Sequence, residues 1–268
     1  MRIATWNVNS IRARLEQVLA WLGINPDLDL LCLQETKVED EKFPMSEFQT
    51  RGYFVYAYGQ KTYNGTALIS KHPLNLVQSG FSALLSSDRA KAFDDQKRLL
   101  SGVIQDVRVV NLYVPNGSAV DSEKFFYKLA WLELFHEYLA LLLERETNII
   151  LCGDFNVALS DLDIHDPTDR EIKVMATDRE RQSLRGILDL GFVDVLRHLY
   201  PEQRCYTWWD YRGGSFRRNL GWRIDYHLVS NSLLNRVQDC TVDVGPRKNS
   251  QPSDHAPVIL TLKDYSNS

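Results

Sequence analysis

The sequence predicts a four-layer α/β sandwich, in which two packed mixed β-sheets lie between outer layers of helices. About ten strand-like runs recur along the chain, and helical patterns separate several of them. One compact open sheet rarely holds so many strands, so we expect two sheets packed face to face. The sequence contains no linker, tandem repeat or low-complexity segment, which predicts a single domain over residues 1–268.

The expected strands are short apolar runs rich in β-branched side chains. In chain order they are residues 3–8, 28–33, 53–58, 66–70, 102–107, 109–114, 148–153, 224–229, 237–242 and 258–262. Only Arg108 separates the fifth run from the sixth. A parallel crossover needs at least about a dozen residues, so this pair is expected to form a hairpin and the sheets to be mixed.

Helical patterns lie between the strands. They cover residues 11–22, 122–146, 178–190 and, as one short turn, 231–234. In the first pattern apolar side chains recur about every 3.6 residues, and Ser10 is placed to cap the helix. For the third pattern, Asp178 is the expected cap and Gly191 the expected stop.

Charge is unevenly distributed along the chain. The net charge is −4 and the pI is near 5.9, which argues against a protein that binds nucleic acid through bulk charge. Residues 204–223, however, hold five arginines against one acid, Asp210, a net charge of +4 (5 − 1), together with six aromatic side chains. Arginines interleaved with aromatics suit a phosphate backbone and an unpaired base. A packed aromatic loop with solvated arginines is the alternative.

Cysteine usage and apolar run length indicate a compartment. Cys32, Cys152, Cys205 and Cys240 lie far apart and form no CxxC pair, and the first two fall within apolar runs. Buried free thiols in a reducing compartment are therefore expected. The segment after Arg2 lacks the apolar core of a signal peptide, and no apolar run is long enough to span a bilayer. We expect a cytoplasmic protein with no membrane partner.

Six polar clusters lie at the ends of the apolar runs. They are residues 6–9, 33–37, 113–116, 153–156, 222–226 and 253–257, with the sequences WNVN, LQETK, YVPN, GDFN, WRIDY and SDHAP. Their Asn, Glu, Tyr, Asp and His side chains are hard oxygen donors with one imidazole, which suit Mg²⁺ and a phosphate. Only a fold that brings strand ends together can make one site of them.

Two carboxylates follow strands. Glu35 comes after a buried apolar run, where it can face a cleft and hold Mg²⁺, although a surface ion pair with Lys37 is the alternative. Asp154 and Asn156 follow Gly153 and project on one side. In that position Asp154 can take a proton from a water that attacks phosphorus. An ordinary strand-ending turn is the alternative for this segment.

The remaining clusters supply an imidazole and neutral donors. Asp225 lies in a strand and needs a partner. His255 is the candidate, because a carboxylate would hold the imidazole protonated or fix its tautomer. Asn7 can ligate a cation or hold a carboxylate, and Tyr113 and Asn116 can hydrogen-bond phosphate oxygens. A satisfied surface histidine and a core tyrosine are the alternatives for His255 and Tyr113.

Together these clusters closely resemble the exonuclease III family of bacterial AP endonucleases, within the endonuclease/exonuclease/phosphatase superfamily. The match runs essentially from end to end. SDHAP and GDFN are typical of the superfamily, and the full ordered set with LQETK and TWWDYR is specific for the exonuclease III branch. The resemblance implies a Mg²⁺-dependent nuclease, with Mn²⁺ as a substitute. It implies a monomer that acts on double-stranded DNA with an abasic site or a 3′ end and leaves a 3′-hydroxyl.

The resemblance also implies roles for individual residues. The catalytic set is Tyr113, Asp154, Asn156, Asp225 and His255, and the metal set is Asn7, Glu35, Asp154, Asn156, Asp254 and His255. The DNA-binding set is Asn116, Trp208, Arg212 and Trp222, to which the basic stretch adds Arg217 and Arg218. Trp208 and Trp222 match the positions beside an extruded abasic sugar, and Arg212 matches a residue that wedges into the duplex.

One segment departs from the family pattern. Residues 165–177 look shorter than the corresponding loop of the best-known members, which leaves open the balance between exonuclease and AP endonuclease action. Two other functions also stay open. A phosphatase on the same scaffold is disfavoured by the aromatic and basic residues 206–223, and a non-cleaving nucleic-acid-binding relative is disfavoured by the six intact clusters.

Overall fold

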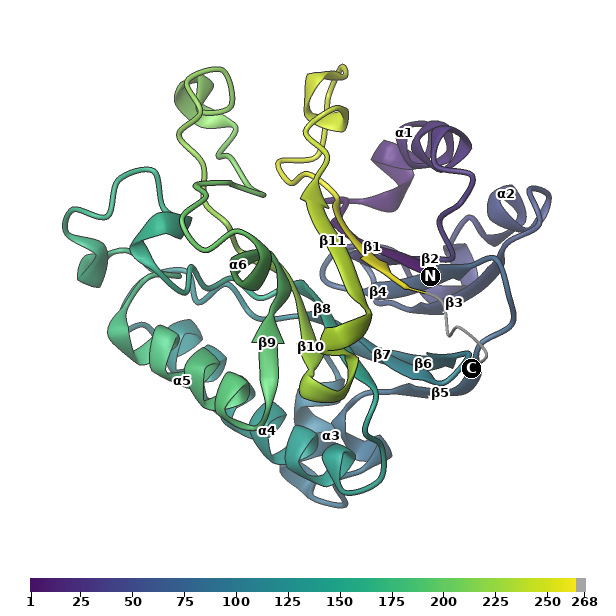
Figure 1. Cartoon of the computed structure of the whole chain (residues 1–268), viewed down its shortest axis with the longest axis horizontal. Coiled ribbons are helices and arrows are strands. Elements are labelled where there is room, and N and C mark those ends of the chain that lie inside the picture. The colour runs from purple at the N-terminus through teal and green to yellow at the C-terminus, as the bar shows by residue number, and fades with distance from the viewer. Residues whose placement is uncertain (264–268) are drawn as a thin grey trace.

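The computed structural model describes residues 1–263 and contains two six-stranded β-sheets packed face to face (Figure 1). The first sheet has the strand order β11 (Val237–Val242), β12 (Val258–Leu262), β1 (Arg2–Asn7), β2 (Leu30–Gln34), β4 (Thr66–Ser70) and β3 (Phe54–Tyr58). The second has the order β5 (Asn75–Ser79), β6 (Leu99–Ile104), β7 (Val107–Tyr113), β8 (Ile149–Asp154), β10 (Asp225–Ser230) and β9 (Phe192–Asp194). β1 is parallel to β2, β7 is parallel to β8, and the remaining pairs are antiparallel, so both sheets are mixed, as predicted.

Helices cover the outer faces of the two sheets. They are α1 (Ile11–Ile24) and α2 (Met45–Gln49) on the first sheet and α3 (Asp88–Asp94), α4 (Glu123–Leu143) and α5 (Asp178–Asp189) on the second, with α6 (Val195–Leu199) packed against β10 and β11. This arrangement confirms the predicted four-layer α/β sandwich.

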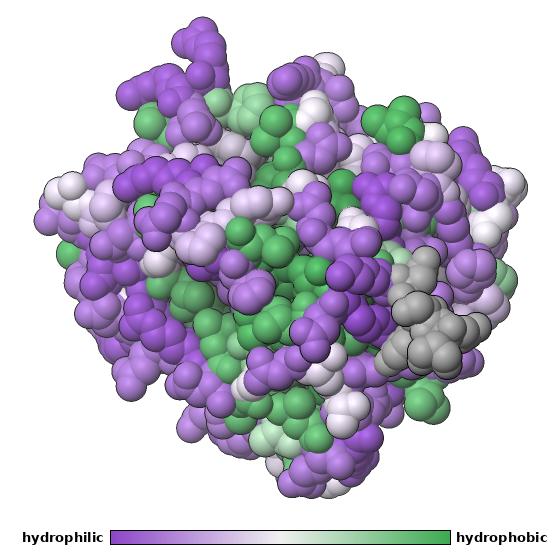
Figure 2. All heavy atoms as spheres, viewed as in Figure 1, coloured by the Kyte–Doolittle hydropathy of each residue, from purple (hydrophilic) through white to green (hydrophobic). Residues whose placement is uncertain are grey.

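Three apolar clusters hold the layers together, because side chains alternate between the two faces of each strand. On β1, Ile3 packs between the sheets and Trp6 packs under α1. On β8, Cys152 packs between the sheets and Leu151 packs under α4. In the view of Figure 2, polar side chains cover the rim of the molecule and apolar ones gather toward the middle.

The helix ends follow local capping chemistry. Ser10 caps α1, as predicted, because its hydroxyl accepts a hydrogen bond from the amide of Ala13. The cap of α5 is Thr177 rather than Asp178. Thr177 and Glu180 form a reciprocal capping box in which each side chain accepts from the other residue's amide. Gly191 follows α5 with φ 109°, which is the predicted stop.

The predicted hairpin exists, but its turn is shifted. The turn lies at Gln105 and Asp106 rather than at Arg108, so β6 and β7 begin two or three residues earlier than expected. Arg108 is buried in β7, where its guanidinium forms an ion pair with Glu146. In the sequence Arg108 looks like a turn residue between two strands. In the structure it lies inside β7, and Glu146, just beyond the end of α4, neutralises its charge.

Five short strands and α-helices are absent from the sequence prediction: β5, α2, α3, β9 and α6. β5 is a mostly exposed edge strand without apolar alternation, and β9 has only three residues. Each of these two strands pairs with a longer neighbour, β6 and β10 respectively. Pairing across the sheet defines such strands, and the local sequence carries little sign of it.

The cysteines behave as expected. All four thiols are free, with Cys32, Cys152 and Cys240 buried and Cys205 half-buried. Within residues 1–263, none of the helices combines the length and apolar character that crossing a bilayer requires.

Candidate active site

The six polar clusters meet at one edge of the sandwich because of strand register. Asn7 and Gln34 pair at the ends of the parallel strands β1 and β2. Tyr113 and Asp154 pair at the ends of β7 and β8, and Asp154 also pairs with Asp225 at the start of β10. The strand ends therefore converge from both sheets, as the sequence argument required.

Asn7 joins the two sheets at this edge. Its side-chain amide donates to Glu35 Oε1 at 2.8 Å and to Asp154 Oδ2 at 2.9 Å, and it is fully buried. Ligand atoms of Glu35, Asp154 and His255 all lie within 4.8 Å of one another. The site thus offers two carboxylates and an imidazole at metal-binding spacing, and the carboxylate oxygens are of the kind that Mg²⁺ prefers.

Asp154 lies at the centre of the cluster and is 1 % exposed. Burial raises the pKa of its carboxyl to about 7, although the facing His255 acts in the opposite direction. The carboxylate also accepts a hydrogen bond from the amide of Asn156 at 2.9 Å. A carboxyl group with a pKa near neutrality is suited to take up a proton at physiological pH.

His255 is held as a cation by carboxylates on both sides. Its Nδ1 lies 2.9 Å from Asp225 Oδ2, and its Nε2 lies 3.8 Å from Asp154 Oδ2. Burial alone would lower the pKa of the imidazole, but Asp225 and Asp154 raise it to about 10. The structure thus contains the Asp225–His255 pair that the sequence predicts.

The sequence offered two roles for Glu35, a residue facing the cleft and a partner of Lys37, and the structure shows both contacts. It does form an ion pair with Lys37, at 2.9 Å, and it also faces Asp154 through Asn7. Burial would raise the pKa of Glu35, but Lys37 and Asn7 hold it below its usual value. Glu35 is therefore an anion at neutral pH, which suits a cation ligand.

Asn156, Asn116 and Tyr113 form a second wall of the site. The side-chain amide of Asn116 donates to Asn156 Oδ1 at 3.0 Å. The side-chain amide of Asn156 donates to the carbonyl of Val114 at 2.9 Å. Asn156 has φ 50°, a left-handed conformation that asparagine tolerates better than most residues. Burial raises the pKa of Tyr113 well above its usual range, so its hydroxyl is a neutral donor, and Arg98 stacks 4.5 Å from its ring.

Asp254 lies beside the cluster of Glu35, Asp154 and His255. Its carboxylate accepts from Trp208 Nε1 at 2.9 Å and from the Asn9 amide at 3.0 Å. Burial would raise the pKa of Asp254, but the His255 cation holds it below its usual value. Asp254 therefore links the cluster to the neighbouring tryptophan.

Trp208 and Trp222 line a cavity of about 500 Å³ next to this site. Their rings meet edge to face with centroids 6.5 Å apart. Trp208 also forms an isolated backbone bridge with His255, which fixes the cavity against the cluster of Glu35, Asp154 and His255. His165 and Met175, from the segment that departs from the family pattern, line the same cavity.

The basic stretch divides into two groups. Arg212, Arg217 and Arg218 are exposed on the loop beyond Trp209, and within residues 1–263 none of them forms an ion pair. Arg223 is different, because it is 1 % exposed and binds Asp163 and Asp194. It stabilises the interior beneath the loop, so the predicted basic surface is smaller than the count of arginines indicates.

Two positioning residues escaped the sequence analysis. Thr207 Oγ1 donates to Asp225 Oδ2 at 2.6 Å, on the carboxylate that holds His255. Lys128, fully buried on α4, donates to the carbonyl of Asn156 at 2.6 Å. A lysine three residues after Phe125, on the apolar face of a predicted helix, was the available signal; Thr207 carries none.

This fold and this cluster define a class of metal-dependent phosphoester hydrolases, and the chain belongs to the Endonuclease/Exonuclease/phosphatase family, whose model matches residues 4–255. An exodeoxyribonuclease of Bacillus subtilis is 35 % identical over 266 residues, which cover 98 % of this chain and 99 % of that protein. The structure of an AP endonuclease from Archaeoglobus fulgidus has a TM-score of 0.91 and 42 % identity, over 98 % of this chain and 100 % of that one. The 3′ phosphatase NExo from Neisseria, bound to a product DNA hairpin, has a TM-score of 0.92 and 41 % identity, over the same shares. The chain is a hydrolytic nuclease of this group.

Proposed function

We propose that this chain is a Mg²⁺-dependent DNA repair nuclease that cleaves 5′ to abasic sites and trims 3′ ends, leaving a 3′-hydroxyl. The observation that carries this proposal is the cluster in which Glu35, Asp154 and His255 place ligand atoms within 4.8 Å of one another, beside the tryptophan-lined cavity. The relatives are named as an exodeoxyribonuclease, an AP endonuclease and a 3′ phosphatase, which supports DNA as the substrate.

The donor set of the cluster fits a hard divalent cation. Glu35 and Asp154 would hold Mg²⁺, with Mn²⁺ as a substitute, and Asn7 fixes the two carboxylates relative to each other. When bound, the ion would act as a Lewis acid on a phosphoryl oxygen. His255 belongs to the same cluster, and its Nε2, 3.8 Å from Asp154 Oδ2, would face a phosphate bound there.

The chain's own groups would carry the proton and bind the phosphate. Asp154 would take the proton of the attacking water. The backbone amide of Asn156 donates to the Asp154 carboxylate and fixes its orientation. His255, as a cation held by Asp225, would donate through Nε2 to a phosphate oxygen and stabilise the charge that develops there. Tyr113 would act as a further neutral donor from β7.

The cavity beside the cluster would receive the abasic sugar. Trp208 and Trp222 present apolar ring faces, and the cost of extruding a nucleotide is least where the base is missing. Arg212, Arg217 and Arg218 would then contact the duplex around the lesion. Contacts to phosphates carry no base identity, so we expect weak sequence preference.

One set of assays tests this function. A labelled duplex with a single abasic analogue is compared with an undamaged blunt duplex and with a soluble phosphomonoester, each with Mg²⁺ and with EDTA. Nicking beside the lesion and shortening of the blunt duplex, both stopped by EDTA, are expected. Turnover of the phosphomonoester alone would instead identify a phosphatase, and metal-independent binding without cleavage would identify a non-cleaving relative.

A further inference from the structure

The loop of residues 210–220 forms one wall of the tryptophan cavity. Three of its residues line that cavity: Asp210, Ser215 and Leu220. It also carries the three exposed arginines that the proposed function assigns to the duplex, so we call it the arginine loop. Its backbone includes two left-handed glycines, Gly213 and Gly214, with φ 64° and 63°. Glycine restrains a backbone least, so contacts from outside the loop must fix its position.

Arg247 packs against the arginine loop from a neighbouring loop. The segment between β11 and β12, residues 243–257, rises from the same edge of the sandwich (Figure 1). Arg247 lies on it and is 6 % exposed. Its guanidinium carbon lies 4.9 Å from the ring centroid of Phe216 and 5.8 Å from the centroids of Trp209 and Tyr211. Three rings in or next to the arginine loop thus converge on one cation at cation–π distance.

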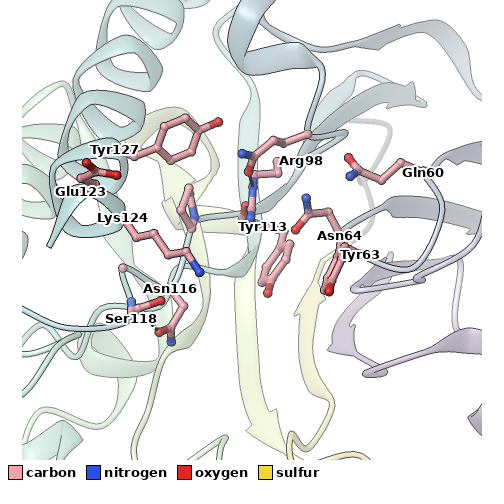
Figure 3. Close-up of a pocket in the computed structure, with 13 residues that line it drawn as sticks. Gln60, Tyr63, Asn64, Arg98, Tyr113, Asn116, Ser118, Glu123, Lys124 and Tyr127 are labelled. Atoms are coloured by element: carbon pink, nitrogen blue, oxygen red, sulfur yellow. Dashed lines mark hydrogen bonds between the residues drawn. The ribbon is translucent and has the colours of Figure 1, made fainter.

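The rings, rather than a carboxylate, hold this cation. Within residues 1–263 Arg247 forms no ion pair, and its Nε is buried without a hydrogen-bond partner. Arg98 differs, because it lies over the ring of Tyr113 but also donates hydrogen bonds to Gln96 and to the Tyr113 carbonyl (Figure 3). Burying a cation without a counter-ion is unfavourable, and an apolar side chain in the same space would avoid that cost. The arginine therefore contributes something other than stability.

A second arginine holds the hydroxyl of Tyr211. That hydroxyl donates to the carbonyl of Pro252 at 2.8 Å. Arg14 of α1 donates to the same hydroxyl at 3.2 Å and to the carbonyl of Pro252 at 3.3 Å. Tyr211 is thus fixed through its hydroxyl by α1 and through its ring by Arg247. Arg212 is the next residue along the chain.

We propose that Arg247 is a positioning residue that fixes the arginine loop before DNA binds, so that the cavity wall and Arg212 are already in place. Arg247 also donates to the carbonyl of Ser253, two residues before His255, which ties the loop to the cluster of Glu35, Asp154 and His255. A loop ordered in advance loses less conformational freedom on binding, so its benefit falls on affinity. This inference rests on the proposed function, because only a DNA lesion would use both the cavity and the arginines.

Hydrogen exchange without DNA tests the clamp directly. Arg247→Met removes the charge and keeps an unbranched side chain that can pack on the rings. The amides of Arg218 and Leu220, which donate to the carbonyls of Gly214 and Ser215, should exchange about tenfold faster in this variant. Lys248→Gln is the matched control, because Lys248 is the adjacent exposed cation, and it should leave both rates unchanged. Equal rates in Arg247→Met and the wild-type protein would overturn the proposal.

Cleavage of the abasic duplex tests the consequence for the reaction. Arg247→Met should raise KM about tenfold and change kcat less than about twofold. The affinity of the apoprotein for Mn²⁺ should stay as in the wild-type protein. Arg247→Lys should recover most of the affinity for DNA, because an ammonium group also binds ring faces. Tyr211→Phe keeps the ring but loses the hydroxyl contacts, so its KM should rise by a smaller factor.

Two outcomes of this second experiment would overturn the proposal. One is an unchanged KM in Arg247→Met. The other is a fall in kcat together with a loss of Mn²⁺ affinity, which would mean general damage to the site. A wild-type protein that leaves abasic DNA uncut would instead refute the proposed function, and the hydrogen-exchange rates would still decide whether Arg247 fixes the loop.

Discussion

The buried ammonium group of Lys128 donates a hydrogen bond of 2.6 Å to the backbone carbonyl of Asn156 and also pairs with the fully buried carboxylate of Glu180. Asn156 has a left-handed backbone, and Glu180 closes the capping box of α5. One cation thus ties the outer helices α4 and α5 to a residue of the candidate active site.

Lys128→Met should destabilise the fold by about 3–5 kcal/mol, because it leaves Glu180 buried without its partner. The free energy of unfolding in urea measures this. Adding Glu180→Gln removes both charges while an amide oxygen still accepts from Thr177, so the double variant should lose less than the sum of the two single losses. Arg89→Gln breaks an exposed pair with Glu133 and, as the control, should cost less than about 1 kcal/mol.

Asp154→Asn should reduce cleavage of abasic DNA about 10³-fold while DNA binding is retained, because the amide cannot take a proton from water. Asparagine keeps the size of the side chain, and Asn7 remains as a neighbour. Single-turnover cleavage and fluorescence anisotropy give the two quantities. Cleavage at a rate near that of the wild-type protein would show that another group removes the proton.

Asp225→Asn should shift the loss of activity at alkaline pH toward neutral pH. In the wild-type protein the pKa of His255 is about 10, so the imidazole stays protonated through the neutral range. Loss of the Asp225 charge lowers that pKa, and the active cation is then lost as pH rises from about 6 to 9. The pH profile of kcat, together with an NMR titration of His255, checks the sign. An unchanged profile would mean that the charge of His255 plays no part in the reaction.

Acid should destabilise the protein through His227. Burial lowers the pKa of this imidazole to about 4, and its Nε2 lies 3.0 Å from the carbonyl of Val258. Below about pH 6.5 His227 therefore binds a proton in the unfolded chain but stays neutral in the folded chain. The stabilisation is present above that pH and decreases as pH falls toward 4, by on the order of 3 kcal/mol.

His227→Gln should flatten this part of the curve of unfolding free energy against pH. The exposed His72 provides the control position, and His72→Gln should leave the slope as it is in the wild-type protein. An equal slope in the His227 variant and the wild-type protein would assign the acid sensitivity to other groups.

Chelation should abolish cleavage, and Mg²⁺ or Mn²⁺ should restore it. Glu35→Gln should raise the Mg²⁺ concentration for half-maximal activity about 10-fold or more, because the cluster loses an anionic ligand. Glu39→Gln is the matched control, since Glu39 forms an ion pair with the exposed Lys42. Calorimetric titration of the apoprotein with Mn²⁺ measures binding without cleavage. Equal affinity in both variants would remove Glu35 from the metal set.

Much of the candidate site could be predicted from the sequence because its residues stand at strand ends. Asp154 follows an apolar run at Gly153, and Glu35 follows another, so the chain marks both positions locally. The Asp225–His255 pair could also be anticipated, because a carboxylate inside a strand needs a partner. Thr207 could not, since a threonine in an aromatic loop has no pattern that distinguishes it.

The sequence by itself determined the order of the main elements, the mixed four-layer architecture and the identity of the polar clusters, because hydrophobic periodicity and strand-end chemistry are local properties. Only the tertiary structure decided which charged side chains are exposed at the surface. Arg223 is buried in ion pairs with Asp163 and Asp194, whereas Arg212 is exposed, although both belong to one basic stretch. Partners distant in sequence determine burial and charge pairing, and strand register brings those partners together.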